Sequence, residues 1–389
     1  MNNRILLPLL ASIVAITPLA VDMYLPAMLT IANELNTSME NVQVSLSLYL
    51  AGYALGMLVF GPLADQYARR KLALFGLGGF ALTSVGLALC TEIEQFWLLR
   101  VLQAFTGAAA TVVVPGIVRH LYQEHTAKGM SYVSMIMMIA PLVAPTVGAG
   151  LMVLWHWTAI FWVLAAYALL TLIWSYYQLI DIPLKPSSKR GLALFIDNYK
   201  VVLGEPKARF DIITSMAVSF GFFCFLTSVP FVYLEYFQVS EQWFGVLFAC
   251  NIIALTLGNL INTRLVTRLG SRKMLYLSLA LGLVCALLLN AVSYFHWGLY
   301  PTVFTIAPLM MCLGVIASNA DALILLAFEH KSGTATAVIG TLRFGSGALV
   351  GPLLAIIQPQ DAKAFSVMML GAIVLTLFAQ YRQKQQSLQ

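Results

Sequence analysis

An aspartate stands inside the first long apolar stretch of this chain. Residues 21–28 read VDMYLPAM, and Asp22 is the acidic residue among them. A charged side chain within a membrane span costs about 3 kcal/mol to insert, so it is rare and marks function by default. Tyr24 and Pro26 add a hydroxyl group and a local helix irregularity. Asp22 is therefore interpreted either as a proton-exchange group or as a structural residue bonded to neighbouring helices.

A second polar group lies in a later apolar stretch, at about 95–118. Arg100 is five or six residues from the outer end of that stretch, which is a depth similar to that of Asp22. An arginine inside a span needs a carboxylate, a carbonyl or water, so it acts as a structural clamp or in a proton path. Burial favours a neutral carboxyl group and a nearby arginine favours the charged one. Asp22, Tyr24, Arg100 and Gln103 thus form the candidate proton-coupling and substrate site.

The second half of the chain carries another acidic and basic residue within spans. Asp321 lies about 12 Å and Arg343 about 15 Å from the inner ends of consecutive spans, at the helical rise of ~1.5 Å per residue. Similar depth on antiparallel neighbours permits a salt bridge. A structural pair and a substrate or proton site both remain open, and an Arg343 without a partner would point to an anionic substrate.

The composition indicates an all-α polytopic membrane protein. The chain has 389 residues, of which 60% are hydrophobic and 10% are charged. Apolar runs of the length that crosses a bilayer recur along the whole sequence. Division at the polar breaks predicts twelve transmembrane helices, at about 5–30, 41–63, 72–91, 95–118, 130–154, 158–180, 210–236, 243–263, 274–295, 301–328, 333–357 and 363–381.

The distribution of lysine and arginine predicts the orientation. Nineteen of the 22 basic residues fall in the tails and loops of one side if the N-terminus is inside. Cytoplasmic loops carry this excess, so both termini are expected in the cytoplasm. The net charge of +6 then belongs to the inner membrane face and is no indication of nucleic-acid binding.

The spans divide into two halves of six. We expect an N-terminal half at 1–180, a cytoplasmic linker at 181–209 and a C-terminal half at 210–389. Apolar residues of the linker share one helical face, which predicts a short helix on the inner leaflet, with a flexible linker as the alternative. Glycine motifs recur at an offset of 197 residues, from Gly61 to Gly258 and from Gly148 to Gly345. Such duplication places a transporter's substrate site near the midplane.

The short inner loop between the second and third spans reads GPLADQYARRK over residues 61–71. By itself it could be an ordinary positively charged loop, with a carboxylate that caps the next helix or pairs with a base. It resembles the loop signature of the major facilitator superfamily, except that Ala68 stands where the signature has glycine. The resemblance implies a conformational gate formed by Gly61, Asp65, Arg69, Arg70 and Lys71.

Two further motifs resemble the same superfamily. LLRVLQAFTG contains Arg100 and Gln103 and is similar to its R-x-x-Q-G motif, with Ala104 in place of glycine. APLVAPTVGAG, at 140–150, resembles the antiporter motif of drug exporters. Its small residues also allow close helix packing, which is the plainer interpretation. The antiporter-motif residues are Pro141, Pro145, Gly148 and Gly150.

The stretches DMYLPA and SLSLYLAGYALGMLVFGPLAD resemble the bicyclomycin-resistance (Bcr/CflA) branch of drug:proton antiporters. The resemblance implies proton-coupled efflux of small, partly apolar compounds by alternating access, in the bacterial inner membrane. The alternative is an exporter of a specific metabolite such as a nucleoside, a sugar or a siderophore.

Other classes of protein have little support in the sequence. It contains no G-x-S-x-G, H-E-x-x-H, Walker A or dinucleotide-binding pattern, so we expect neither an enzyme nor a cofactor. The five cysteines stand singly in predicted spans without metal-ligand spacing, and no metal is expected. The expected partners are a small-molecule substrate, protons and the lipid bilayer, and the expected state is a monomer.

Overall fold

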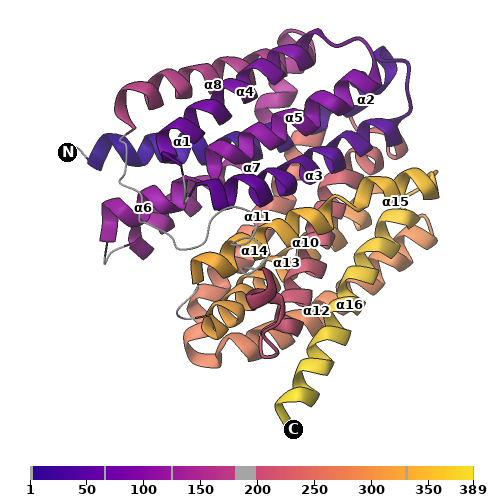
Figure 1. The fold of residues 1–389 in the computed structure, drawn as a ribbon. Helices are drawn as coiled ribbons and strands as arrows, with labels where there is room; N and C mark the ends of the chain where they lie inside the picture. The colour runs from indigo at the N-terminus through magenta and orange to yellow at the C-terminus, as the bar shows by residue number, and fades with distance from the viewer. Residues whose placement is uncertain (1–2, 65–66, 124–125, 180–198, 329–331, 389) are drawn as a thin grey trace. The chain divides into compact units, whose positions relative to one another are not determined.

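The computed structural model describes residues 3–64, 67–123, 126–179, 199–328 and 332–388. Within these ranges every regular element is helical (Figure 1). The chain divides into two compact units, Met1–Ile196 and Asp197–Gln389. Each unit has its own core and is described separately below.

The N-terminal unit is built from long helices joined by short loops. α1 packs against α7 and α8, α4 packs against α5 and α8, and α3 packs against α5. Its elements are α1 (Asn3–Asp22), η1 (Leu25–Ala27), α2 (Met28–Glu34), α3 (Met39–Leu63), α4 (Arg69–Leu89), α5 (Ile93–Thr111), α6 (Val114–Tyr122), α7 (Thr126–Leu154) and α8 (Thr158–Gln178).

The C-terminal unit repeats this plan. α10 packs against α13, α14 and α16, α12 packs against α13 and α16, and α11 packs against α13. Its elements are α10 (Arg209–Pro230), the π-helix η3 (Phe231–Tyr236), α11 (Glu241–Leu269), α12 (Ser271–Tyr294), α13 (Leu299–Ala327), α14 (Ser332–Gly347), α15 (Val350–Ile357) and α16 (Lys363–Leu388).

Prolines interrupt several membrane-spanning segments. The helix of the first span ends at Asp22, four residues before Pro26. The helix of the fourth span ends at Thr111, four residues before Pro115. A proline has no N–H to donate to the carbonyl four residues earlier, so the helix loses a hydrogen bond at each place. The seventh span widens into η3 directly after Pro230. The helix irregularity expected near Pro26 is thus confirmed.

Eleven segments among the described residues are long and apolar enough to cross a membrane, whereas the sequence predicts twelve. The difference concerns the predicted fifth span, at 130–154. α7 occupies its place with 29 residues, and its described side chains over Ile139–Leu154 form an apolar segment. Each of the other predicted spans corresponds to one of the eleven segments.

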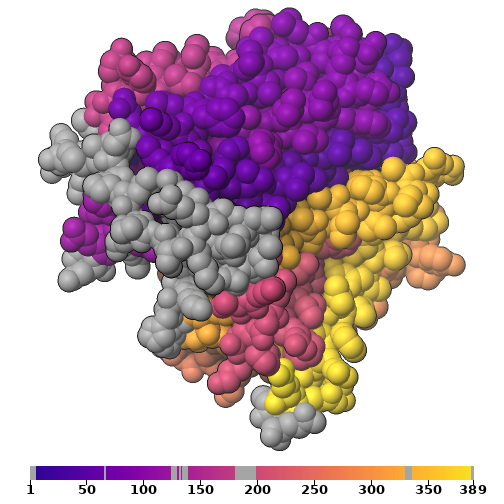
Figure 2. Space-filling view, in the orientation of Figure 1, coloured from indigo at the N-terminus to yellow at the C-terminus, as the bar shows by residue number. Residues whose placement is uncertain are grey.

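Glycines let neighbouring helices approach closely within each unit, whose outer surface is drawn in Figure 2. A Cβ atom on Gly56 of α3 would lie 2.7 Å from the carbonyl oxygen of Phe105 in α5. A Cβ atom on Gly258 of α11 would lie 2.6 Å from the carbonyl oxygen of Met311 in α13. Gly61 is the residue 197 positions before Gly258. Unlike Gly258, it has open space around it. Contacts of this kind allow membrane helices to associate through van der Waals packing.

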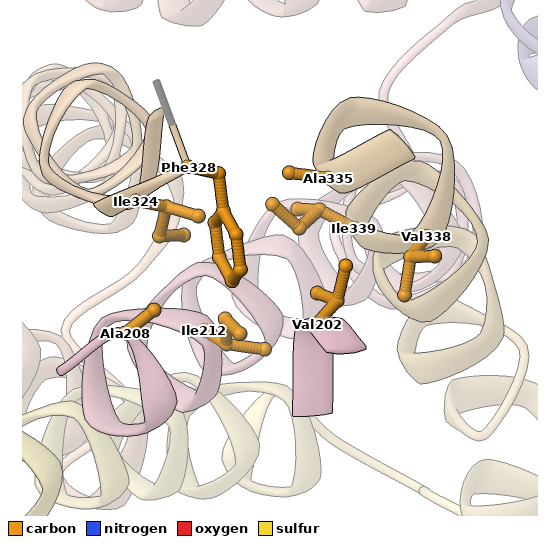
Figure 3. Close-up of a cluster of buried hydrophobic side chains, with 8 residues drawn as sticks. All are labelled: Val202, Ala208, Ile212, Ile324, Phe328, Ala335, Val338 and Ile339. Atoms are coloured by element: carbon orange, nitrogen blue, oxygen red, sulfur yellow. The ribbon is translucent and has the colours of Figure 1, made fainter. Parts of the chain in front are cut away.

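A buried apolar cluster in the C-terminal unit joins the start of α10, the end of α13 and the start of α14 (Figure 3). Val202 joins this cluster, so the described end of the predicted linker packs onto the unit's own helices. Residues 181–198, where most of the predicted interfacial helix would lie, are outside the described residues. The cluster consists of Val202, Ala208, Ile212, Ile324, Phe328, Ala335, Val338 and Ile339.

Candidate functional site

Asp22 is the last residue of α1, at the break that Pro26 causes. The carboxyl group is buried, with only 2% of the residue exposed, and its Oδ1 atom has no hydrogen-bond partner among the described residues. An uncompensated charge in such a place is costly, whereas the neutral acid is tolerated. The carboxyl group of Asp22 therefore lies in a setting where its protonation state depends on what approaches it.

Arg100 of α5 is completely buried, yet it has no ion-pair partner in the described part of the chain. Its guanidinium lies between two aromatic rings, 4.3 Å from the ring centroid of Tyr24 and 4.4 Å from that of Tyr49. Nη1 donates to the carbonyl oxygen of Ala20, in the last turn of α1, at 3.1 Å. Cation–π contacts and a carbonyl thus hold the buried charge in place of a carboxylate.

Gln103 fixes the arginine from one turn further along α5. Its Oε1 accepts from Nη1 of Arg100 at 2.8 Å, and its Nε2 donates to Oγ of Ser84 at 2.8 Å. Ser84 in turn donates to the carbonyl oxygen of Phe80, one turn back in α4. This chain of bonds sets the orientation of the amide, so Gln103 can only present its oxygen to Arg100.

Tyr24 connects the two charged groups. Its ring stacks on Arg100, and its position is two residues from Asp22. The hydroxyl oxygen is 3.4 Å from Oγ of Ser45. The structure thus gathers Asp22, Tyr24, Arg100 and Gln103 in one place, which we call the Asp22 cluster. The residues that the sequence did not single out, Tyr49, Ser45 and Ser84, complete it.

Gly148 brings the antiporter motif onto this cluster. A Cβ atom at Gly148 of α7 would overlap the carbonyl oxygen of Met23, the residue after Asp22, so α7 lies directly on the broken segment. Gly150 faces open space instead. Pro141 and Pro145 lie inside α7, on the N-terminal side of Gly148. The motif thus includes one residue that packs on the break and one that does not.

The arginines of the predicted gate tie the start of α4 to other helices of its unit. Nη1 of Arg69 donates to the carbonyl oxygen of Gly116 in α6 at 3.0 Å, and Arg70 donates to the carbonyl oxygen of Tyr176 in α8. Arg70 also lies over the Tyr176 ring, 5.3 Å from its centroid. A cation near the last turn of a helix is stabilised by the exposed carbonyls there.

Gly61 and Lys71 of the predicted gate take no comparable part. Gly61 lies in the last turn of α3 with open space around it, and Lys71 is exposed. Asp65 lies outside the described residues.

Asp321 and Arg343 form an ion pair in the C-terminal unit. Nη1 of Arg343 lies 2.8 Å from Oδ2 of Asp321. Both side chains are about one-third exposed, at 34% and 32%. Ser215 donates to Oδ1 of Asp321 at 3.1 Å, and Nε of Arg343 donates to Oγ of Ser219 at 2.9 Å. The two charges are therefore paired but not buried, and their role in transport stays a prediction.

Sequence reasoning missed a second ion pair in this unit. Arg272, at the start of α12, binds both carboxylate oxygens of Asp211 at 2.6 and 2.9 Å. Gln380 of α16 accepts from Arg272 and donates to Asp211 and Thr214. Bidentate geometry makes such a pair strong and specific. Opposite charges at the inner ends of predicted spans were the available signal, because Asp211 begins the seventh span and Arg272 precedes the ninth.

Comparison with known proteins gives a consistent result. The family model described as Major Facilitator Superfamily matches residues 10–352 of this chain. A bicyclomycin resistance protein homolog of Haemophilus influenzae is 32% identical over 94% of this chain and 92% of that protein. A chloramphenicol resistance protein of Pseudomonas aeruginosa is 29% identical over 88% of this chain and 82% of that protein. The crystal structure of a mutant of the nucleoside transporter NupG covers 98% of this chain and 99% of its own, with a TM-score of 0.73 and 11% identity.

Proposed function

Because this chain belongs to the major facilitator superfamily and is therefore a membrane transporter, we propose that it exports small, partly apolar compounds in exchange for protons. Export proceeds by alternating access, in which a central site opens to one side of the membrane at a time. The names of the two resistance proteins support antibiotics as one kind of cargo.

The observation that carries this proposal is the state of the Asp22 carboxyl group. It is buried at a helix break, and Oδ1 has no hydrogen-bond partner among the described residues. A carboxyl group that was purely structural would have its oxygens bonded, because an unbonded buried oxygen lowers stability. Asp22 is thus suited to hold a proton in this state and to release it when a partner or water reaches it.

Arg100 supplies the positive charge that would favour release of the proton from Asp22. Tyr24 and Tyr49 hold it as a fixed positive charge, and Tyr24 stands two residues after Asp22; the Nε and Nη2 atoms of Arg100 have no hydrogen-bond partner among the described residues. A movement of the broken segment that brings Asp22 to these donors would favour the carboxylate. Cargo that drives such a movement would expel the proton, which couples the two by linkage.

The gate residues act on the conformational step. Arg69 and Arg70 connect α4 with α6 and α8 inside the N-terminal unit. Bonds that exist in one state and break in another set the rate of exchange between states. Asp65 belongs to this gate in the proposal because of its place in the motif.

The proposed orientation in the membrane rests on the distribution of basic residues. The excess of basic residues in the loops of one side supports an orientation with both termini in the cytoplasm. The bacterial relatives support the inner membrane as the location. A single chain carries the whole proposed machinery, so a monomer is the functional unit in this proposal.

Export of a specific metabolite is the alternative within the same class. An Arg343 without a partner would have favoured an anionic metabolite, and the ion pair with Asp321 removes that argument. A neutral metabolite and a neutral antibiotic are equally compatible with the pair. The proposal therefore commits to proton-coupled export and leaves the natural cargo to a growth screen against toxic compounds and metabolites.

Proton release from detergent-solubilised protein tests the proposal. Chloramphenicol or bicyclomycin is added to purified, weakly buffered protein, and the pH is recorded across neutral and mildly alkaline conditions. We expect release by the natural chain and none by Asp22→Asn, because the amide cannot hold an exchangeable proton of this kind. Asp361→Asn, in a loop of the other unit, serves as the control and should release protons like the natural chain.

Two results would contradict the proposal. Cargo that binds without releasing protons from the natural chain would indicate a uniporter. Undiminished release from Asp22→Asn would place the exchanged proton on another residue.

A further inference from the structure

Four polar residues of the C-terminal unit form one connected network. Asp321 of α13 bonds Arg343 of α14 and Ser215 of α10, and Arg343 bonds Ser219 of α10. Ser219 also donates to the carbonyl oxygen of Ser215, which links the two serines. We refer to Ser215, Ser219, Asp321 and Arg343 as the Asp321 cluster.

Asp321 and Arg343 are partly exposed although they lie within membrane-spanning helices. Asp321 and Arg343 fall inside the apolar segments Leu299–Ala327 and Ala335–Ile357, and each side chain is about one-third exposed. Exposure of a charged pair to hydrocarbon is strongly unfavourable, so intramembrane charges face protein or a water-filled volume. The exposed part of this pair therefore faces a volume that solutes can enter.

The pair still has hydrogen-bonding capacity on both partners. Arg343 uses Nε for Ser219 and Nη1 for Asp321, while Nη2 has no hydrogen bond to any described residue. Each carboxylate oxygen of Asp321 accepts one bond, from Ser215 or from Arg343, and a carboxylate oxygen can accept about two. The cluster thus offers a donor and an acceptor side by side.

Charge balance decides what kind of solute can use these groups. The charges of Asp321 and Arg343 cancel within the pair. A cation would compete with Arg343 for Asp321, and an anion would compete with Asp321 for Arg343. Either one would separate the pair and leave one charge in the span without its partner, which costs more than the intact pair. An uncharged solute can bond both groups and leave the pair in place.

Aromatic residues flank the cluster. Phe344 follows Arg343 in α14, and Phe223 lies one turn beyond Ser219 on α10. The two rings are 5.4 Å apart between centroids and tilted by 43°. A Cβ atom on Gly347 would overlap the Phe223 ring, so Gly347 lets α14 pack closely against this ring. Phe223 is buried, so the partly exposed ring of Phe344 supplies the apolar face here, which favours a solute with an apolar or aromatic face next to its polar groups.

We propose that the Asp321 cluster is a cargo-recognition site that selects uncharged solutes carrying both a hydrogen-bond donor and an acceptor beside an apolar face. This site refines the proposed export function. It rests on that function, because the solute bound here is taken to be the exported one. It assigns proton exchange and cargo selection to different units, with Asp22 in the N-terminal unit and the Asp321 cluster in the C-terminal unit. The alternative is a pair that only stabilises the unit.

Binding to the purified full-length protein in detergent tests the assignment without requiring transport. Chloramphenicol is the uncharged probe, with hydroxyl and amide groups, and tetraphenylphosphonium is a cation without hydrogen-bonding groups. In Arg343→Lys the ion pair can persist, but the separate Nη2 donor position is lost, because the remaining donors of lysine all sit on the one nitrogen held at Asp321. We expect chloramphenicol affinity to fall about tenfold, the usual effect of one hydrogen bond to a charged group, while tetraphenylphosphonium affinity changes less than about twofold.

A variant that removes the positive charge should change the affinities for the two probes in opposite directions. Arg343→Gln leaves Asp321 as an uncompensated carboxylate, so tetraphenylphosphonium should bind more tightly and chloramphenicol more weakly. Asp361→Asn, which breaks an ion pair with Lys363 in a loop of the same unit, is the matched control and should alter neither affinity. Folded yield and melting temperature of every variant are measured alongside.

The outcomes separate this inference from the proposed function. Equal changes for both probes in Arg343→Lys, or none, would show a structural pair and overturn the inference. Export could then still proceed, so the proton-release measurement with Asp22→Asn would stand unaffected. If instead the affinities split as expected and no proton is released from the natural chain, the recognition site holds and proton coupling fails.

Discussion

The two units of this transporter treat an aspartate and an arginine in opposite ways. In the N-terminal unit, Asp22 and Arg100 are both buried, and rings and carbonyls hold Arg100 while an oxygen of Asp22 has no described partner. In the C-terminal unit, Asp321 and Arg343 meet at 2.8 Å and are one-third exposed. The first arrangement keeps a carboxyl group ready to change protonation state, whereas the second keeps two charges neutralised.

The difference follows from burial and partners and not from residue type. A buried carboxyl group without a bond gains much from protonation, and a paired carboxylate near water gains little. The same two side chains can therefore serve exchange in one unit and recognition in the other. The predictions below test this contrast, beginning with the largest expected effect.

Asp22→Asn should abolish the response of efflux to a pH gradient, because the amide keeps the shape but cannot be ionised. Asp321→Asn should lower efflux but leave the response to the gradient. Vesicles with an imposed pH gradient and a fluorescent or radiolabelled cargo provide the measurement. A normal gradient response in Asp22→Asn would remove the distinction between the two aspartates.

Arg100→Lys should be more damaging than Arg343→Lys. Lysine at position 100 loses the planar contact with Tyr24 and Tyr49, and such desolvated cation–π contacts are worth about 2 kcal/mol. Lysine at position 343 can still reach Asp321. Thermal unfolding of purified variants should show the larger drop in melting temperature for Arg100→Lys. Equal drops would mean that the ring contacts add nothing to the fixed charge.

Gly148→Ala should impair transport while Gly150→Ala should not. The added methyl group at Gly148 would meet the backbone of Met23, and such overpacking costs about 1–3 kcal/mol, whereas Gly150 has open space. Because the contact lies next to Asp22, we expect the proton response to weaken together with stability. The comparison uses efflux rates at equal amounts of folded protein, and similar rates for the two variants would disconnect α7 from the Asp22 cluster.

The smallest effect concerns the ion pair itself. Asp321→Asn and Arg343→Gln should each reduce folded yield, and the double variant should recover part of the loss, because the pair removed whole leaves no lone charge. The pair is one-third exposed, so solvent screening limits the coupling energy to about 1 kcal/mol. Losses that simply add would mean that the two side chains do not interact in the membrane.

Much of the fold is encoded locally and could be predicted from the sequence. The apolar runs locate the spans, because a helix in a bilayer satisfies its backbone hydrogen bonds internally and needs apolar side chains over a fixed length. Pro26 locates the break after Asp22, because a missing N–H acts only four residues away. The motif residues could likewise be recognised from short patterns.

The partners of the polar side chains could not be predicted in this way. Depth along a helix is readable from the sequence, and it indicated correctly that Asp321 and Arg343 lie at similar levels. Depth alone suggested the same for Asp22 and Arg100, where the structure places no ion pair. Rotation of each helix about its own axis separates the two cases, and that rotation is set by packing against helices far away in the chain.

The sequence by itself determined which residues are costly to bury, since hydrophobicity and charge are properties of single residues and short runs. Only the tertiary structure decided which of them meet. Arg272 finds Asp211 and Gln380 across three helices, Gly148 reaches the backbone of Met23, and Arg100 finds two tyrosine rings. The physical reason is that hydrogen bonds and ring contacts act over a few ångströms, so their partners are fixed only when helices distant in sequence are packed together.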